Sequence, residues 1–222
     1  VPADWRSHTS HTLGMRPPGD LFIVSSPSGA GKTTLIRRIL ADPAFVGTIH
    51  FSVSHTTRPA RPGEVHGREY YFVSPEEFES LASRDGFLEH AVYDGHHYGT
   101  SRGEVEPRLA AGIDVVLDID VQGARQVRSR MPEVVKVFVF PPSRQVLEER
   151  LTARGHNTPE SIARRLGAAA RELAEFGEYD YAIINDVLDA AVDELRSIVV
   201  ARRSSRRRRQ ERLEAILRTF PA

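Results

Sequence analysis

Short apolar runs alternate along the chain with segments that have helical periodicity. Glycine, proline or acidic residues bound each run. The runs occupy residues 20–25, 115–120, 134–140 and 181–185. Continuous apolar runs of this length are typical of strands that are buried on both faces of a parallel sheet. With helices expected at 31–41 and 143–151, this order predicts an α/β fold with a doubly wound parallel sheet.

Residues 50–105 depart from this pattern. The runs at 50–54 and 70–73 are strand-like and are bounded by proline and glycine. Ser74 followed by Pro75 and two glutamates predicts the start of a helix. We therefore expect a small mixed α/β lobe, inserted between the first helix and the next core strand.

The last ~35 residues have an apolar face at helical spacing, and we expect them to form one amphipathic helix. The face consists of Leu188, Val192, Leu195, Ile198 and Val199. Such a face could pack on the protein's own core or pair two subunits, so a homo-oligomer remains open.

Composition limits the class of protein. A chain of 222 residues with 40% hydrophobic residues suits one sizeable domain, or a core with small inserted lobes. No run approaches the ~18 apolar residues of a membrane helix, and residues 1–20 lack the apolar centre of a secretory signal. The absence of cysteine excludes disulfides and thiolate metal sites. We expect a cytoplasmic protein without a membrane partner.

Charge adds one local feature to this picture. The formal net charge is zero, which argues against nucleic acid as a general partner. Residues 202–209 nevertheless form a basic block with six arginines. Such a block at a helix end is typical of a solvated tail, so we disfavour binding of RNA or DNA through it.

A glycine-rich sequence follows the first apolar run and precedes the first helix. It reads Ser26-Pro27-Ser28-Gly29-Ala30-Gly31-Lys32-Thr33. A strand, glycine-rich turn and helix in this order aim backbone N–H groups and a helix N-terminus at one point, which suits a polyphosphate. Lys32 can place its charge on the phosphates, and the Thr33 hydroxyl can bind Mg²⁺.

The strict phosphate-loop pattern has glycine where this chain has Ser26, and an ordinary glycine-rich turn is the alternative. Lysine and threonine at the required offsets favour the phosphate site. A second candidate is the pair Arg58 and Arg61, flanked by prolines, because arginine forks bind phosphate oxygens in pairs. These arginines could instead be solvated or paired with Glu64 and Glu69.

Six segments together resemble the guanylate kinase family, in its bacterial, stand-alone form. They are 26–33, 52–58, 61–67, 98–100, 117–123 and 184–186. The resemblance runs from about residue 20 to 210, in the family's order and spacing. It implies a P-loop NTPase fold and transfer of the γ-phosphoryl group of ATP to GMP or dGMP, giving ADP and GDP, with Mg²⁺ bound to ATP.

The resemblance also assigns site residues. The ATP phosphates would contact residues 26–34, which are Ser26, Pro27, Ser28, Gly29, Ala30, Gly31, Lys32, Thr33 and Thr34. Arg150, Arg154 and Arg165 would close on these phosphates from a helical lid, and Asn185 would lie beside adenine. Thr33 would bind Mg²⁺, and Asp118 would do so directly or through water. Lys32, Arg58 and the three lid arginines would be the catalytic cations.

For the second substrate, the resemblance implies that the phosphate of GMP is held by Arg58, Arg61, Tyr70 and Tyr98. Glu89 and Asp120 would accept from guanine N1–H and its amine, while Ser54 and Thr100 would donate to O6. A carboxylate facing adenine N1 would meet another acceptor and be left unpaired, which gives discrimination. In isolation, Glu89 could be a solvated surface residue, and Asp118 and Asp120 could cap the following helix.

The implied division of the chain has four parts. They are a flexible N-terminal arm (1–19), a core (20–51, 104–142 and 167–222), a GMP-binding lobe (52–103) and a lid (143–166). Two other classes stay open: a nucleoside monophosphate kinase of different base specificity, and a non-catalytic guanylate-kinase-like binding module. The retained Lys32 and Thr33 favour an enzyme over the module.

Overall fold

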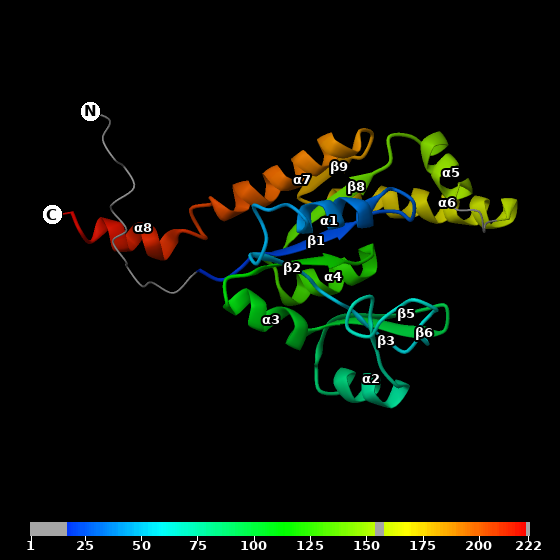
Figure 1. The fold of residues 1–222 in the computed structure, drawn as a ribbon, viewed down its shortest axis with the longest axis horizontal. Coiled ribbons are helices and arrows are strands. Elements are labelled where there is room, and N and C mark those ends of the chain that lie inside the picture. The colour runs from blue at the N-terminus through cyan, green and yellow to red at the C-terminus, as the bar shows by residue number, and fades with distance from the viewer. Residues whose placement is uncertain (1–16, 154–157, 221–222) are drawn as a thin grey trace.

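A parallel sheet of five strands forms the centre of the molecule (Figure 1). Its strands are β1 (Leu21–Ser25), β2 (Ile49–Phe51), β7 (Asp114–Asp118), β8 (Val135–Phe140) and β9 (Tyr181–Ile184). Their order across the sheet is β2-β7-β1-β8-β9. The structure is a computed structural model that describes residues 17–153 and 158–220. The predicted core strands are confirmed, and the run at 50–54 adds β2 to this same sheet.

The connections from β1 and β7 leave toward opposite edges of the sheet, because β1 leads to β2 and β7 leads to β8. In open α/β sheets, ligands bind in the crevice at the carboxyl ends of two such strands. The topology therefore directs attention to the loops that follow β1 and β7.

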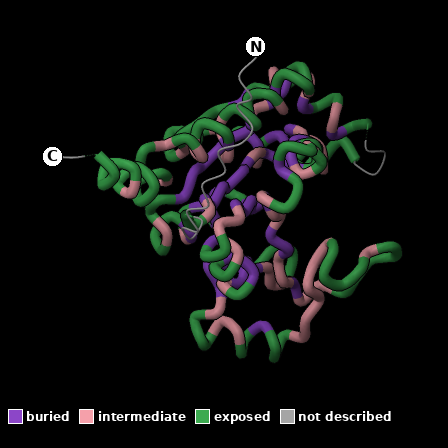
Figure 2. The backbone as a smooth tube through the Cα atoms, turned by 60° about the vertical axis from the view of Figure 1, so that its left-hand side comes forward, coloured by how far each residue is buried: buried purple, intermediate pink, exposed green. Residues whose placement is uncertain are grey.

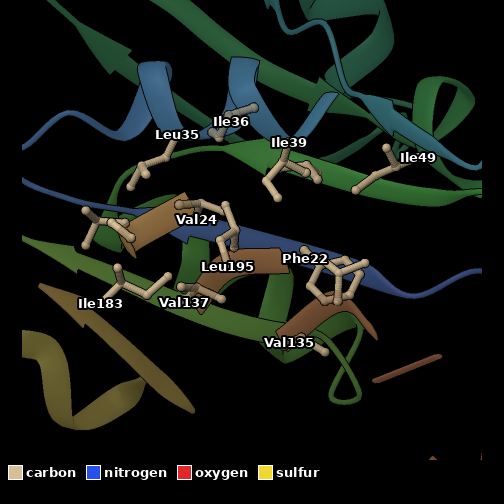
Figure 3. Close-up of a cluster of buried hydrophobic side chains, with 14 of the residues drawn as sticks. Phe22, Val24, Leu35, Ile36, Ile39, Ile49, Val135, Val137, Ile183 and Leu195 are labelled. Carbon is tan, nitrogen blue, oxygen red and sulfur yellow. The ribbon is translucent and has the colours of Figure 1, made fainter. Parts of the chain in front are cut away.

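Helices cover both faces of the sheet (Figures 1 and 2). The helices α1 (Lys32–Leu40) and α7 (Leu188–Arg203) lie on one face, and α3 (Arg102–Ala110) and α4 (Val121–Arg130) lie on the other. Alternate residues of β1 enter the two resulting cores: Phe22 and Val24 pack with Leu195 (Figure 3), and Ile23 packs on the opposite side. This burial on both faces explains why the strand sequences are continuously apolar.

The inserted segment forms a second, mixed sheet. Its strand order is β4-β3-β6-β5, with the bounds β3 (His55–Thr56), β4 (Tyr71–Phe72), β5 (Phe87–Tyr93) and β6 (His96–Ser101). Helix α2 (Pro75–Ala82) starts where the sequence predicts, because Ser74 and Glu77 form a reciprocal capping box. This sheet extends from one side of the core (Figure 1).

Two further helices, α5 (Arg144–Thr152) and α6 (Pro159–Ala174), pack against each other through Leu147, Leu151 and Leu166. A short 3₁₀ helix, η1 (Glu175–Glu178), follows α6. The expected boundary between lid and core at 166/167 falls inside α6, and the boundary at 103/104 falls inside α3. The fourfold division stays a prediction, and the arm lies largely outside the described residues.

None of the helices that the structure describes is both long and apolar enough to cross a lipid bilayer.

The prediction of one helix over the last ~35 residues is wrong. Helix α7 ends at Arg203, and a separate helix α8 (Gln210–Leu217) follows after turns at 204–209. The break occurs in the basic block. Two serines, which favour turns over helix interiors, precede its last four arginines.

The basic block is also not simply a solvated tail, because four of its arginines, including Arg207 at 3.7 Å from Asp20, contact two buried aspartates. Arg202 contacts Asp20 at 2.9 Å and Arg203 contacts Asp114 at 2.7 Å. Arg208 bridges both carboxylates, at 2.7 Å to Asp20 and 2.5 Å to Asp114. Since each aspartate is at most 6% exposed, the arginines neutralise charge that the fold has removed from water.

We expect Arg208→Ala to lower the free energy of unfolding by about 3 kcal/mol, because two buried carboxylates lose a shared partner. Urea unfolding at pH 7 measures this loss. Arg206→Ala is the matched control, since Arg206 is exposed in the same turn, and should change stability by less than about 0.5 kcal/mol. Equal effects of the two substitutions would contradict a stabilising role for this network.

Candidate functional site

The glycine-rich sequence forms the turn between β1 and α1. Gly29 and Gly31 both have φ of 97°, a conformation that L side chains rarely adopt. Gly31 caps the N-terminus of α1 without a side-chain hydrogen bond. The first N–H groups of a helix have no partner within the helix, so they can bind an anion.

Lys32, Thr33 and Asp118 meet at the carboxyl ends of β1 and β7. Lys32 Nζ lies 2.6 Å from Asp118 Oδ1, and the Thr33 hydroxyl donates to Asp118 Oδ2 at 3.4 Å. A hydroxyl and a carboxylate are the hard oxygen donors that Mg²⁺ takes, with water and substrate phosphates completing its coordination. The residues present therefore fit the predicted metal.

Arginines from the expected lid already contact the phosphate loop. Arg165 donates to the Ser28 hydroxyl at 3.0 Å. Arg150 donates to the Ala30 carbonyl at 3.4 Å and to the Asn185 carbonyl at 3.0 Å. Arg154 lies outside the described residues. The structure thus brings two of the three predicted lid cations to the loop.

Asn185 is buried and binds the loop directly. Its side-chain Nδ2 donates to the Ala30 carbonyl at 2.7 Å, and only 4% of the residue is exposed. The family resemblance implies a place beside adenine, and no contact in the structure tests that expectation.

In the inserted lobe, Arg58 lies with Tyr70 and Tyr98. The Arg58 guanidinium carbon is 5.5 Å from the centre of the Tyr70 ring, and the two tyrosine rings are 5.8 Å apart. Arg58 also binds both carboxylate oxygens of Glu64 at 2.9 Å. The open alternative of pairing with Glu64 is therefore what the structure shows for Arg58.

The other predicted arginine of this pair, Arg61, is exposed. Its backbone N–H donates to Glu64 Oε2 at 2.8 Å, so Glu64 binds both arginine residues. Glu69 does not pair with either of them and instead contacts Arg68 at 2.7 Å.

Glu89 is a buried carboxylate at the start of β5. It is 6% exposed, and Oε1 accepts a hydrogen bond from the Thr100 hydroxyl at 2.7 Å. A Cβ added at Gly123 in α4 would lie 3.0 Å from Glu89 Oε2, so this glycine makes room for the carboxylate. Burial raises the pKa of Glu89; the Thr100 hydrogen bond opposes this rise, and the charge of Asp120 adds to it.

Asp120 is exposed and caps α4, with Oδ1 accepting from the Gly123 N–H at 2.8 Å. The capping alternative is therefore observed, and both carboxylates lie close to Gly123, since a Cβ added there would lie 3.0 Å from Glu89 Oε2. In this structure the Thr100 hydroxyl donates its hydrogen bond to Glu89, so this donor is not presented to a nucleotide base. Ser54 is half-buried, and its carbonyl pairs with the Tyr71 N–H at 2.9 Å.

Two residues near the site gave no signal in the sequence. Gln126 of α4 bonds both backbone groups of His90, accepting at 3.2 Å and donating at 3.1 Å, and so ties α4 to the strand of Glu89. Glu172 of α6 is half-buried; burial raises its pKa, and the nearby charge of Lys32 lowers it. A single glutamine or glutamate on an amphipathic helix looks like any surface residue.

A phosphate loop after the first strand, with a lysine held by an aspartate at the neighbouring strand end, is the nucleotide site of a P-loop protein. Residues 19–202 match the family model described as guanylate kinase. The chain belongs to the guanylate kinase family.

Individual relatives agree with this assignment. The chain is 48% identical over 199 residues to the guanylate kinases of Escherichia coli K12 and Nitrosococcus oceani. These matches cover 90% of this chain and 96% or 97% of each relative. The crystal structure of guanylate kinase from Anaplasma phagocytophilum is similar with a TM-score of 0.69 at 33% identity, covering 86% of this chain and 90% of that one.

The raised pKa of Glu89 predicts that Glu89→Gln stabilises the folded protein without substrate at neutral and alkaline pH. Because the folded pKa lies above the ordinary value of 4.5, ionisation costs stability as the pH rises through it. The advantage of Glu89→Gln should vanish below pH 4.5, grow as the pH rises toward the raised pKa of the folded state and then level off, as measured by urea midpoints.

Glu69→Gln is the control of opposite sign, because hydrogen bonds from Arg68 and the Val65 N–H lower the pKa of Glu69. Its stabilising contribution is present above the ordinary pKa and is lost as the pH falls, so this variant should be less stable than the parent at neutral pH. A Glu89→Gln protein that is less stable than the parent at pH 8 would contradict the burial argument.

Proposed function

We propose that this chain transfers the γ-phosphoryl group of ATP to GMP, and to dGMP, giving ADP and GDP or dGDP. The observation that carries the proposal is the buried Glu89 carboxylate. It accepts a hydrogen bond from the Thr100 hydroxyl and lies close to Gly123 in α4, the helix that follows β7. Membership of the guanylate kinase family supports it. No predicted residue is assigned to the ribose 2′-hydroxyl, which is why dGMP is included.

On the ATP side, the N–H groups of residues 26–34 and the N-terminus of α1 would bind the phosphates. Lys32 would exchange Asp118 for a phosphate oxygen, a change of partner that leaves its charge neutralised throughout. Arg150 and Arg165 would add charge from the lid, as would Arg154, whose role rests on the family resemblance alone.

Thr33 and Asp118 would hold Mg²⁺ with the ATP phosphates. The metal ion supplies neutralisation of the charge on the phosphates. With Lys32 released toward the nucleotide, the Asp118 carboxylate would be free to bind the ion directly or through water.

On the GMP side, Arg58, Arg61, Tyr70 and Tyr98 would bind the substrate phosphate. Arg58 would leave Glu64 for this phosphate, in parallel with the exchange at Lys32. Burial raises the pKa of the Tyr70 phenol, which keeps it protonated and able to donate a hydrogen bond at neutral pH.

Guanine would be recognised by acceptors and donors of the right pattern. Glu89 and Asp120 would accept from N1–H and the exocyclic amine, and Ser54 and Thr100 would face O6. Adenine presents an acceptor at N1, so Glu89 would lose its partner and adenine would be rejected.

In the reaction, an oxygen of the GMP phosphate would attack the γ-phosphorus in line, and the bond to the ADP oxygen would break. This oxygen is already anionic, so no strong general base is needed. Catalysis then consists of positioning and charge neutralisation by Lys32, Arg58 and the lid arginines. Closure of the lid would exclude water and so prevent hydrolysis of ATP.

We expect turnover with Mg-ATP to be confined to GMP and dGMP in a panel that includes AMP, CMP and UMP. Lys32→Met should lower kcat by about 10²–10³-fold, because it removes one preorganised cation from the phosphates. ADP formation measures both. Lys136→Met, which removes the chain's other lysine, is the matched control and should keep kcat within about threefold below its unfolding temperature.

Preference for another nucleotide would contradict the assigned specificity for guanine. The protein would still be a nucleoside monophosphate kinase. Absence of turnover with every nucleotide, in protein shown to be folded, would favour the non-catalytic binding module.

Glu89→Gln should lower kcat/KM for GMP about 100-fold, since a carboxylate acceptor for two guanine donors is lost. The same substitution should leave the weak reaction with AMP no slower than in the parent. A fall of equal size with both nucleotides would contradict the role of Glu89 in reading the base.

A further inference from the structure

The side-chain amide of Asn185 donates a hydrogen bond to the phosphate loop. We propose that Asn185 is a positioning residue that holds the Ala30–Gly31 peptide in its anion-binding orientation, rather than a residue that reads adenine. The inference deepens the proposed function and rests on it. Its geometric basis is the 2.7 Å hydrogen bond from Asn185 Nδ2 to the Ala30 carbonyl, between residues 155 positions apart.

A second donor reinforces this contact. Arg150 Nη1 donates to the same Ala30 carbonyl at 3.4 Å, and Arg150 Nη2 donates to the backbone carbonyl of Asn185 at 3.0 Å. The carbonyl of Ala30 therefore accepts from two side chains, one of which also fixes the end of β9. Ala30 is fully buried, so its carbonyl depends on these protein donors for hydrogen bonds.

Holding this carbonyl also fixes an N–H group. In a trans peptide the C=O and the following N–H point in opposite directions, and the described backbone has no cis peptide bond. With the Ala30 carbonyl turned to Asn185, the Gly31 N–H points away from it, together with the N–H groups that begin α1. A flipped peptide would present a carbonyl oxygen to the phosphates in place of this donor.

Glycine makes the flip easy, because it accepts backbone angles on both sides of φ = 0. The loop therefore needs a restraint from outside itself. Glycine is also what lets the restraint approach: a Cβ on Gly31 would lie 2.2 Å from Asn185 Nδ2. The matched glycine, Gly29, has the same φ of 97°, but its Cβ would meet Leu147 and Leu151 instead.

Burial argues against an adenine-reading role. Asn185 is 4% exposed and its amide nitrogen already has a partner within the protein. A side chain that reads the adenine edge must present a free donor or acceptor to the ligand. The position of Asn185 instead serves the phosphate groups, which all nucleoside triphosphates share.

The experiment compares the parent with Asn185→Ala and Asn185→Leu, the second of which keeps side-chain volume without the donor. We expect both to weaken inhibition by inorganic tripolyphosphate about tenfold, equivalent to about 1.4 kcal/mol. The KM for ATP should rise by a similar factor. The preference for ATP over ITP, measured as a ratio of kcat/KM, should change less than twofold.

An unchanged tripolyphosphate constant, with a loss of preference for ATP over ITP, would overturn the inference and restore the adenine role. Turnover of GMP by the parent tests the proposed function separately, and the unfolding measurements below test the Asn185 contact without turnover, so the two can fail independently.

A stability cycle gives a second test that needs no nucleotide. In the parent, Gly31→Ala suffers both backbone strain and collision with Asn185, whereas in Asn185→Ala only the strain remains. We expect the destabilisation by Gly31→Ala to shrink in that background, and that by Gly29→Ala to stay the same in both. Equal costs of Gly31→Ala in the two backgrounds, by urea unfolding, would contradict the contact.

Discussion

The ion pair between Lys32 and Asp118 is the interaction around which the site is organised. It joins the loop after β1 to the end of β7, at 2.6 Å, where two neighbouring parallel strands send their connections in opposite directions. Arg58 repeats the arrangement in the lobe by binding Glu64. A half-buried cation without a partner is costly, and in this structure a carboxylate holds both Lys32 and Arg58. Under the proposed function, phosphate binding at these two cations is an exchange of one anion for another.

Helix α4 connects the proposed base-reading residues with the core. Its first turn carries Asp120 and leaves space at Gly123 for the Glu89 carboxylate. One turn further on, Gln126 bonds both backbone groups of His90, the residue after Glu89. Recognition of guanine is therefore assigned to a strand of the inserted sheet whose position is fixed by a helix of the central sheet.

Much of the fold could be predicted from the sequence, because the determining signals are local. Continuous apolar runs located the strands, and the capping sequence at Ser74 located α2 within a residue. The positions of Lys32 and Thr33 relative to the glycines predicted a phosphate site in this loop. The roles of the remaining site residues came from family resemblance, and they stay predictions.

Interactions between distant segments were not visible in the sequence. The apolar pattern after Leu188 suggested one helix, but Arg202, Arg203 and Arg208 turn back to aspartates at the start of β1 and β7, more than 80 positions away. The contact of Asn185 with Ala30 is of the same kind. Periodicity reports which face of an element is buried, and it carries no information on which polar group that face will meet.

A crystal structure with GMP, Mg²⁺ and a non-hydrolysable ATP analogue tests the central claim most directly. The account predicts that Lys32 Nζ has left Asp118 for oxygens of the β- and γ-phosphates, that Arg58 has left Glu64 for the GMP phosphate, and that Glu89 lies within hydrogen-bond distance of guanine N1. Lys32 still bound to Asp118 beside an occupied nucleotide site, or guanine bound away from Glu89, would contradict it.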